Sequence, residues 1–192
     1  MRLLRAADRA PIPWKNGGGV THDVIVSPAG ATMDDFDWRI SIAEIARSGP
    51  FSRFPGIDRK LAVLEGKVAL TIEGGARLTL DPHAAALDFH GESAVQADLV
   101  DGPSRDLNVM TRRGRFASRM TRRSAAALTL SAGTAVIVAL GKLTAAGQDM
   151  EALDALLIDD AEQSSLTIGP ADFYLIEITG PSAMTTGRIS AT

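Results

Sequence analysis

Lys15 and Asn16 stand directly before three consecutive glycines in the segment PWKNGGGVTHD, residues 13–23. A cation and an amide beside a backbone without Cβ atoms could hold an anionic group at the rim of a pocket. The segment is not a phosphate-binding P-loop or a Rossmann fingerprint, because the lysine precedes the glycines and a strand pattern follows them. The alternative interpretation is a plain turn that leads into a strand.

A second stretch, GPFSRFPGIDRKLAVLEG at 49–66, has the layout of the first metal-binding motif of cupin barrels. That motif has two histidines and a glutamate. Here Arg59 stands at the glutamate position, while Ser52 and Phe54, or Arg53 and Pro55, stand at the histidine positions. A guanidinium in place of an acidic ligand favours a carboxylate over a divalent cation, because arginine can bind a carboxylate with two parallel hydrogen bonds. The alternative for Arg59 is a surface ion pair with Asp58 or another acid.

Other catalytic patterns are weak. His22, His83 and His90 lack the spacing of a metal site, the chain has no cysteine, and no G-x-S-x-G elbow marks a nucleophilic serine. We therefore expect no metal and no cofactor.

The arginines between 112 and 123 could contact nucleic acid, but a net charge of −3 and 5% aromatic residues favour a solvated face or an ion-pair seam.

The composition indicates a globular protein. The 192 residues are 45% hydrophobic and 22% charged. The N-terminal residues lack the apolar run of a signal peptide, and the longest apolar stretch, TAVIVALGKL, is too short to cross a membrane. We expect a cytoplasmic protein without a membrane partner.

Strand patterns dominate the chain. The expected strands are 20–28, 36–45, 60–75 with a hinge at Glu65-Gly66, 76–82, 93–103 and 106–116. In 36–45, Trp38 and Ile40 alternate with Arg39 and Ser41, which predicts opposite faces for the two pairs. The segment 149–159 could be a short helix or a strand. Turn residues at intervals of roughly eight to twelve residues predict an all-β antiparallel sandwich or barrel.

An internal similarity predicts two related halves. The segment 61–75 resembles 136–150, and LTLDP resembles LTIGP further along. The composition changes near 112–127. We therefore predict a bicupin: an N-terminal cupin-like barrel with a ligand pocket at 1–110 and a degenerate barrel at 111–192, with strands exchanged between the halves.

The motifs together resemble the HutD/Ves family. PWKNGGGVTHD, FDWRISIAEI, GPFSRFPGIDRKLAVLEG and LVDGPSRDLNVM occur in that order in the family, although Asp23 stands where many members have glutamate. The resemblance implies a metal-free bicupin, with bacterial members linked to histidine-utilisation operons and a proposed ligand-sensing, regulatory role. The residues that fall in family motifs form the expected ligand site: Trp14, Lys15, Asn16, Thr21, Arg39, Ser41, Ser52, Phe54, Arg59, Asp106 and Asn108.

These observations predict a binding protein for a small carboxylate metabolite, such as formylglutamate or urocanate. Arg59 and Lys15 would bind carboxylates, Asn16 and Asn108 would supply amide hydrogen bonds, and apolar walls would come from Trp14 and Phe54.

Two other functions stay open. One is a metal-independent isomerase or hydrolase that uses Lys15, Asp23 or His90 as acid or base, so the sequence leaves enzyme activity undecided. The other is an interaction protein that modulates a transcription factor or an enzyme. A homodimer through an exposed strand edge is a further expectation.

Overall fold

The computed structural model describes residues 1–124, 127–130, 133–159, 165–169 and 171–180. Within this part of the chain, one three-residue 3₁₀ turn, Ala6–Asp8, is the sole helical element, and everything else is strand or connection. The chain is therefore all-β, as predicted. The described residues include no helix that is long and apolar enough to cross a membrane.

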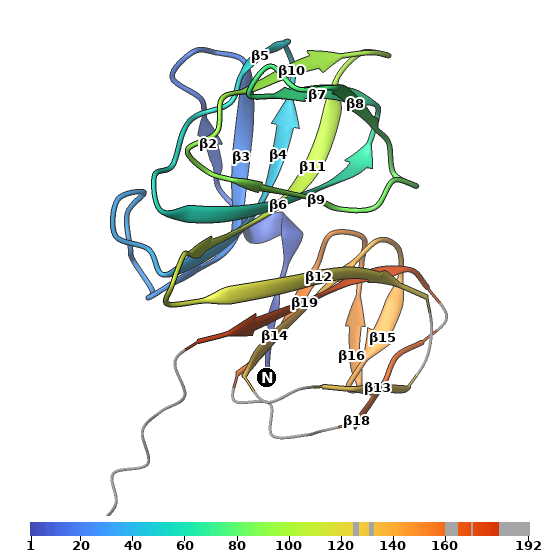
Figure 1. Ribbon diagram of the computed structural model, residues 1–192. Helices are drawn as coiled ribbons and strands as arrows, with labels where there is room; N and C mark the ends of the chain where they lie inside the picture. The colour runs from blue at the N-terminus through green and yellow to red at the C-terminus, as the bar shows by residue number, and fades with distance from the viewer. Residues whose placement is uncertain (125–126, 131–132, 160–164, 170, 181–192) are drawn as a thin grey trace, which may run out of the picture.

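Three antiparallel sheets form the framework (Figure 1). The six-stranded sheet has the order β2 (Pro11–Pro13), β3 (Gly19–Ser27), β4 (Trp38–Ile45), β11 (Ser104–Arg112), β6 (Ile57–Glu65), β9 (Leu87–His90). The four-stranded sheet has the order β5 (Gly49–Pro50), β10 (Val95–Leu99), β7 (Val68–Ile72), β8 (Arg77–Leu80). The five-stranded sheet has the order β1 (Arg2–Leu4), β17 (Ala155–Ile158), β14 (Thr134–Ala139), β19 (Phe173–Thr179), β12 (Ala117–Arg123).

Two small two-stranded sheets complete the described structure. They are β13 (Ala127–Thr129) with β18 (Ser165–Thr167), and β15 (Leu143–Ala145) with β16 (Gln148–Met150). Strands β16 and β17 occupy most of 149–159, so the helix alternative for that segment is wrong and the strand alternative is confirmed. The expected hinge after Glu65 is confirmed as well, because Gly66 has a φ of +75° between β6 and β7.

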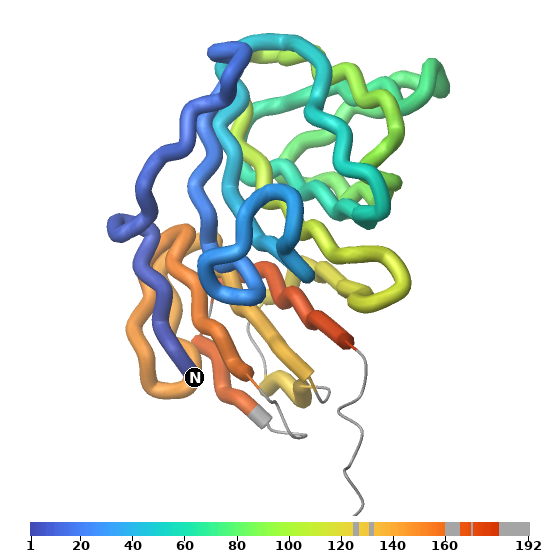
Figure 2. Tube along the Cα trace, turned by 90° about the vertical axis from the view of Figure 1, so that its left-hand side faces the viewer, coloured from blue at the N-terminus to red at the C-terminus, as the bar shows by residue number. Residues whose placement is uncertain are grey.

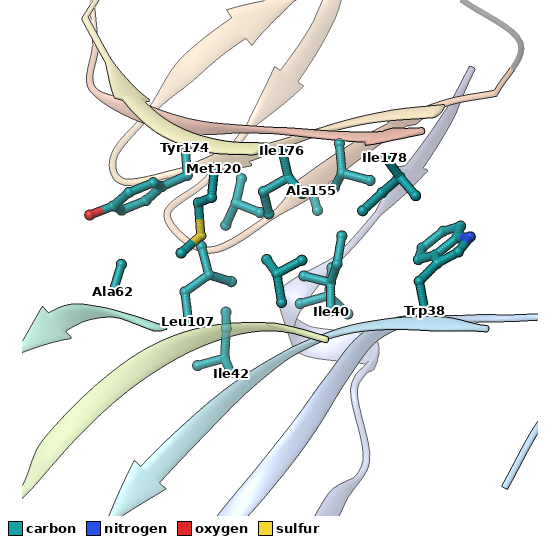
Figure 3. Packing of buried hydrophobic residues seen from close by; sticks show 14 of the residues in the cluster. Trp38, Ile40, Ile42, Ala62, Leu107, Met120, Ala155, Tyr174, Ile176 and Ile178 are labelled. Atoms are coloured by element: carbon teal, nitrogen blue, oxygen red, sulfur yellow. The ribbon is translucent and has the colours of Figure 1, made fainter. Parts of the chain in front are cut away.

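The six-stranded sheet buries one face against the five-stranded sheet. Trp38, Ile40 and Ile42 of β4 point toward Met120 and Ile176 in this layer (Figure 3). The alternation of a strand directs the intervening residues of β4 to the opposite face. That opposite face carries the polar side chains that the sequence predicted for one side of β4.

The N-terminal strand belongs to the sheet built from the later part of the chain. β1 pairs antiparallel with β17, with Arg2 opposite Leu157 (Figure 2). Buried Asp154 accepts hydrogen bonds from the Arg5 guanidinium at 2.8 Å and from the Ala6 amide at 2.7 Å. These bonds hold the segment after β1 against the loop before β17. The division into 1–110 and 111–192 stays a prediction.

Candidate functional site

A cavity of about 440 Å³ opens on the face of the six-stranded sheet that points away from the five-stranded sheet. Its floor comes from β3, β4, β6 and β11, and its rim comes from the segment 12–16, Met33 and the segment 50–54. A smaller cavity of about 220 Å³ adjoins it and shares Trp14, Asn16, Pro50 and Phe51 with it.

Strand register places two arginines in one row of this floor. Met110 of β11 lies opposite Arg39 of β4 on one side and opposite Arg59 of β6 on the other. The two arginines therefore occupy one row of the sheet, with β11 between their strands, and both side chains line the cavity. Each residue is only 7% exposed, so the sheet holds two nearly buried guanidinium groups on the same face.

Arg59 lies in an aromatic cradle. Its guanidinium carbon is 4.9 Å from the ring centre of Phe89 and 5.5 Å from the ring centres of Phe51 and Phe54. Its Nη1 donates to the backbone oxygen of Ser52 at 3.3 Å. Ring faces attract a cation at such distances. The aromatic side chains therefore fix the guanidinium in place without neutralising it.

A chain of hydrogen bonds joins Arg59 to a buried acid. Arg59 Nη2 donates to Asn108 Oδ1 at 3.0 Å, and Asn108 Nδ2 donates to Asp106 Oδ1 at 2.6 Å. Burial, partly offset by Arg59 and by hydrogen bonds from Asn108 and the Ala43 backbone, raises the pKa of Asp106 to about 7. Near neutral pH, Asp106 therefore exists in both protonation states.

Both arginines have capacity to bind an anion. Burial lowers the pKa of Arg59 to about 10, Asp106 opposes this shift, and the positive charge of Arg39 adds to it. Arg59 is still a cation at neutral pH. The Nε atoms of Arg39 and Arg59 are buried and have no hydrogen-bond acceptor among the described residues. Arg39 Nη2 does form an ion pair with Asp23 of β3.

The triglycine segment proves to be a turn that positions the rim of the cavity. Gly17 has a φ of +66°, and its amide donates to the Trp14 carbonyl at 2.9 Å. A Cβ on Gly19 would lie 2.3 Å from the Glu44 carbonyl oxygen and 3.2 Å from the Trp14 ring. The absence of a side chain at Gly19 therefore lets the Trp14 ring pack directly against the backbone.

The residues around this turn form one wall and the mouth. Trp14 Nε1 donates to Thr21 Oγ1 at 2.8 Å, which orients the indole ring at the cavity wall. Asn16 Oδ1 accepts from the Gly18 amide at 2.9 Å. Lys15 is exposed at the mouth and makes no ion pair with a described residue. The mouth thus has one cation that is available to a ligand.

All eleven residues expected at the ligand site line this one cavity: Trp14, Lys15, Asn16, Thr21, Arg39, Ser41, Ser52, Phe54, Arg59, Asp106 and Asn108. Their role in ligand binding stays a prediction. The sequence interpretation missed Phe51 and Met110, which also line the cavity. The alternation of β11 could have indicated Met110, since it follows Asp106 and Asn108 at intervals of two.

The residues of the enzyme hypothesis are not gathered in the cavity. Lys15 is at the mouth, and Asp23 is paired with Arg39 beside the floor. His90 belongs to an exposed cluster instead, where its Nδ1 lies 3.0 Å from Asp58 and 2.9 Å from Arg113. Acid–base chemistry that requires His90 inside this cavity is therefore not supported by its position.

The residues that replace the cupin metal ligands do not fit a metal. Arg59 occupies one position and either Ser52 and Phe54 or Arg53 and Pro55 occupy the other two, and among these side chains only the serine could offer an oxygen ligand. Within the described ranges, no group of three or more His, Asp or Glu side chains could hold a metal ion.

Several arginines of the basic run are occupied by protein partners. Arg113 pairs with Asp58 and Glu92, each at 2.7 Å. Arg122 pairs with Asp172 at 2.6 Å and also donates to the Pro82 carbonyl. Arg122 thus ties the later part of the chain to the earlier part.

The fold and the cavity define a cupin-like, all-β protein. A cupin 2 conserved barrel domain protein from Leptotrichia buccalis superposes with a TM-score of 0.55 at 11% identity, over 93% of this chain and 100% of that chain, which supports the fold alone. The HutD family model matches residues 6–176, and the chain belongs to the HutD family.

Individual relatives agree with this assignment. HutD from Pseudomonas fluorescens has 31% identity and a TM-score of 0.86, over 94% of this chain and 98% of that chain. An uncharacterised Pseudomonas putida protein, named for its position in the hutC 3′ region, is 41% identical over 121 residues, 62% of this chain. Protein Ves of Citrobacter koseri is 44% identical over 109 residues, 56% of this chain. These matches span 63% and 56% of the two curated relatives' own lengths.

Proposed function

We propose that the protein binds a small carboxylate metabolite in the 440 Å³ cavity and acts as a ligand-responsive regulator. One observation carries the proposal: Arg39 and Arg59 lie in one row of the floor, and each has a buried Nε without an acceptor among the described residues. Buried donors normally have hydrogen-bond partners. An anion with two oxygens, placed between the arginines, would provide them.

The charges also favour an anion. Arg39 and Arg59 repel one another, as the effect of Arg39 on the pKa of Arg59 indicates. A carboxylate between them would relieve this repulsion, and each charge-assisted hydrogen bond contributes about 1.5–3 kcal/mol. Lys15 at the mouth would bind a second acidic group. Asn108 at the floor and the aromatic ring of Phe54 would determine the shape of the ligand.

Membership of the HutD family suggests the ligand class. The Pseudomonas putida relative is named for the hutC 3′ region, and we therefore propose a link to histidine utilisation. N-formylglutamate and urocanate, both intermediates of histidine breakdown with carboxylate groups, are the first compounds to test. Binding would then report the metabolic state to a partner protein in the cytoplasm.

Isothermal titration calorimetry tests this proposal. Wild-type protein should bind at least one of these acids with a Kd in the range of about 1 µM to 1 mM. Arg59→Met should weaken that binding at least tenfold. The matched control is Arg53→Met, since Arg53 is exposed in the segment before β6 and does not line the cavity. Absence of binding below about 10 mM, or equal affinity of Arg59→Met and wild type, would contradict the proposal.

A specific observation also favours a second function. Asp106 is a buried acid with a pKa of about 7 beside the arginine that would hold the substrate, as acid–base catalysts often are. The protein would then be a metal-independent isomerase or hydrolase of the same acids. Turnover that a chelator leaves unchanged and Asp106→Asn abolishes would establish this function. Binding without turnover would rule it out for the acids tested.

Two further statements about architecture belong to the same proposal. We propose that the chain is a bicupin whose halves descend from one barrel, with β1 exchanged into the sheet of the second half. We also propose a homodimer through an exposed strand edge, since β8 and β12 end their sheets without a further paired strand among the described residues. Sedimentation velocity would distinguish a monomer from a dimer.

A further inference from the structure

Asp106 is a buried acid at the floor of the cavity, and its position has a consequence for ligand binding. We propose that the cavity takes up one proton with each carboxylate it binds, and that Asp106 is the residue that accepts the proton. The inference rests on the proposed function and adds to it: the site would bind an anion and a proton together, so its affinity would respond to pH.

The geometry isolates Asp106 from direct contact with a cation. The residue is 1% exposed, and none of the described arginine, lysine or histidine side chains forms an ion pair with it. Its carboxylate accepts hydrogen bonds from the Asn108 amide and from the backbone of Ala43. Arg59 acts on it through Asn108, whose Oδ1 accepts from the guanidinium at 3.0 Å. Among the described residues, Arg59 is thus the main charge that balances ionised Asp106.

A bound carboxylate would change this balance. The charged groups around the floor are Arg59 on β6, Arg39 on β4 and Asp23 on β3, and Asp23 is already paired with Arg39. Lys15 is the cation at the mouth, and the lining residues 50–52 on the other side of the cavity carry no charge. An anion bound between Arg39 and Arg59 would therefore place a further negative charge near Asp106 and draw on the positive charge of Arg59 that balances it.

The direction of the effect follows from these charges. A nearby like charge raises the pKa of a carboxyl group. The pKa of Asp106 is already about 7 because of burial. A bound anion would raise it further, so a site that is ionised before binding becomes protonated after it. The affinity for the carboxylate should be highest, and independent of pH, at and below about pH 6. It should fall by up to about tenfold per pH unit above about pH 7.

Calorimetry of the wild-type protein measures the proton directly. N-formylglutamate and formate are suitable probes, because their carboxylates do not titrate above about pH 6. Titrations at about pH 8 in buffers of different ionisation enthalpy give the number of protons taken up from the dependence of the observed heat on the buffer. We expect close to one proton per ligand at this pH and close to none at about pH 6.

Asp106→Asn and Asp88→Asn form a matched pair of variants. Asp88 is exposed on β9, pairs with Lys60 and does not line the cavity. Asp106→Asn should bind without proton uptake and with an affinity that does not change with pH, whereas Asp88→Asn should behave as wild type. Circular dichroism checks that both are folded, and the wild-type buffer series stands without either variant.

The outcomes separate the two proposals. Binding of either probe without proton uptake at about pH 8 would overturn this inference and leave the proposed function intact. Proton uptake that persists in folded Asp106→Asn would overturn the role of Asp106. If neither probe nor urocanate binds wild-type protein, the proposed function fails and this inference fails with it.

Discussion

The interiors of the earlier and later parts of the chain differ in what they bury. Of the ten buried polar or charged residues in the described part of the chain, nine precede residue 112 and one, Asp154, follows it. Each part also has an apolar cluster, and that of the later part includes Leu130, Ile137, Leu156 and Phe173. Both parts are antiparallel sheets of similar strands, so the difference lies in the side chains that fill them.

The contrast indicates a division of roles. An apolar interior stabilises the fold because it removes hydrocarbon from water without leaving polar groups unpaired. Two buried guanidinium groups with unpaired Nε atoms do the opposite, because burial of charge is costly. A protein tolerates such a cost at positions that serve function. The earlier part thus carries the candidate site, and the apolar interior of the later part adds stability without a comparable cost.

Phe173→Ala should produce the largest loss of stability. Phe173 is fully buried in the apolar cluster of the later part, and truncation of a buried phenylalanine typically costs about 3–5 kcal/mol. Urea unfolding measures the loss. The control is Phe51→Ala at the cavity wall, where the ring is only partly buried and the loss should be smaller. Equal losses at both positions would break the proposed contrast.

The pH dependence of stability should reveal the buried acid of the earlier part. The native state holds the proton of Asp106 more tightly than the unfolded state does, because burial raises its pKa from 3.8 to about 7. This contribution is complete below about pH 4 and is lost as the pH rises through about 7, at most about 4 kcal/mol in all. Thermal unfolding at several pH values from about 5 to 8 measures it.

Two variants test the source of that dependence. Asp106→Asn should flatten the fall in melting temperature over this range, while Asp88→Asn, at an exposed position, should retain the wild-type slope. An unchanged slope in Asp106→Asn would mean that other groups determine the pH dependence.

Arg59→Met should separate function from stability. Removing the buried guanidinium should lower carboxylate affinity about 10- to 100-fold, which corresponds to the loss of one charge-assisted hydrogen bond. The free energy of unfolding should fall by less than in Phe173→Ala, because Arg59 makes no direct ion pair with a described residue and Asp106, whose charge it balances, can bind a proton instead. Calorimetry and urea unfolding of the same sample measure the two effects. A large loss of stability would show that Arg59 is a structural residue.

Gly19→Ala should lower stability less than Phe173→Ala does, and it should shift the structure locally at the rim of the cavity. The added methyl group would lie 2.3 Å from the Glu44 carbonyl oxygen, so the backbone or the Trp14 ring must move. Overpacking of this kind costs about 1–3 kcal/mol. The control is Gly49→Ala, where an added Cβ meets no atom within 4 Å. The free energy of unfolding and the tryptophan fluorescence should change in Gly19→Ala and stay the same in Gly49→Ala.

The sequence predicted the strands well because alternation and turn residues are local signals. The six segments expected as strands before residue 117 all contain strands, and the polar side of β4, with Arg39 and Ser41, does line a cavity. Local signals could not decide between helix and strand at 149–159, where a short apolar run is compatible with both. The pairing β16–β15 and the pairing β17–β14 resolved that segment as strand.

The relations between distant residues were not predictable from the sequence. The row Arg39–Met110–Arg59 depends on the register of three strands, and register is a property of the folded sheet. The chain from Arg59 through Asn108 to Asp106 depends on the same register and on side-chain rotamers. The pairing of β1 with β17 joins residues more than 150 positions apart, and no local pattern in the sequence marks it.

Nuclear magnetic resonance of the arginine Nε–Hε groups tests the central claim most directly, because the claim concerns these atoms. Addition of N-formylglutamate, or of another carboxylate that calorimetry shows to bind, should shift the signals of Arg39 and Arg59 in a saturable way. The signal of exposed Arg53 should not move. If the two buried signals stay unchanged while such a ligand saturates the protein, the carboxylate binds elsewhere and the account is contradicted.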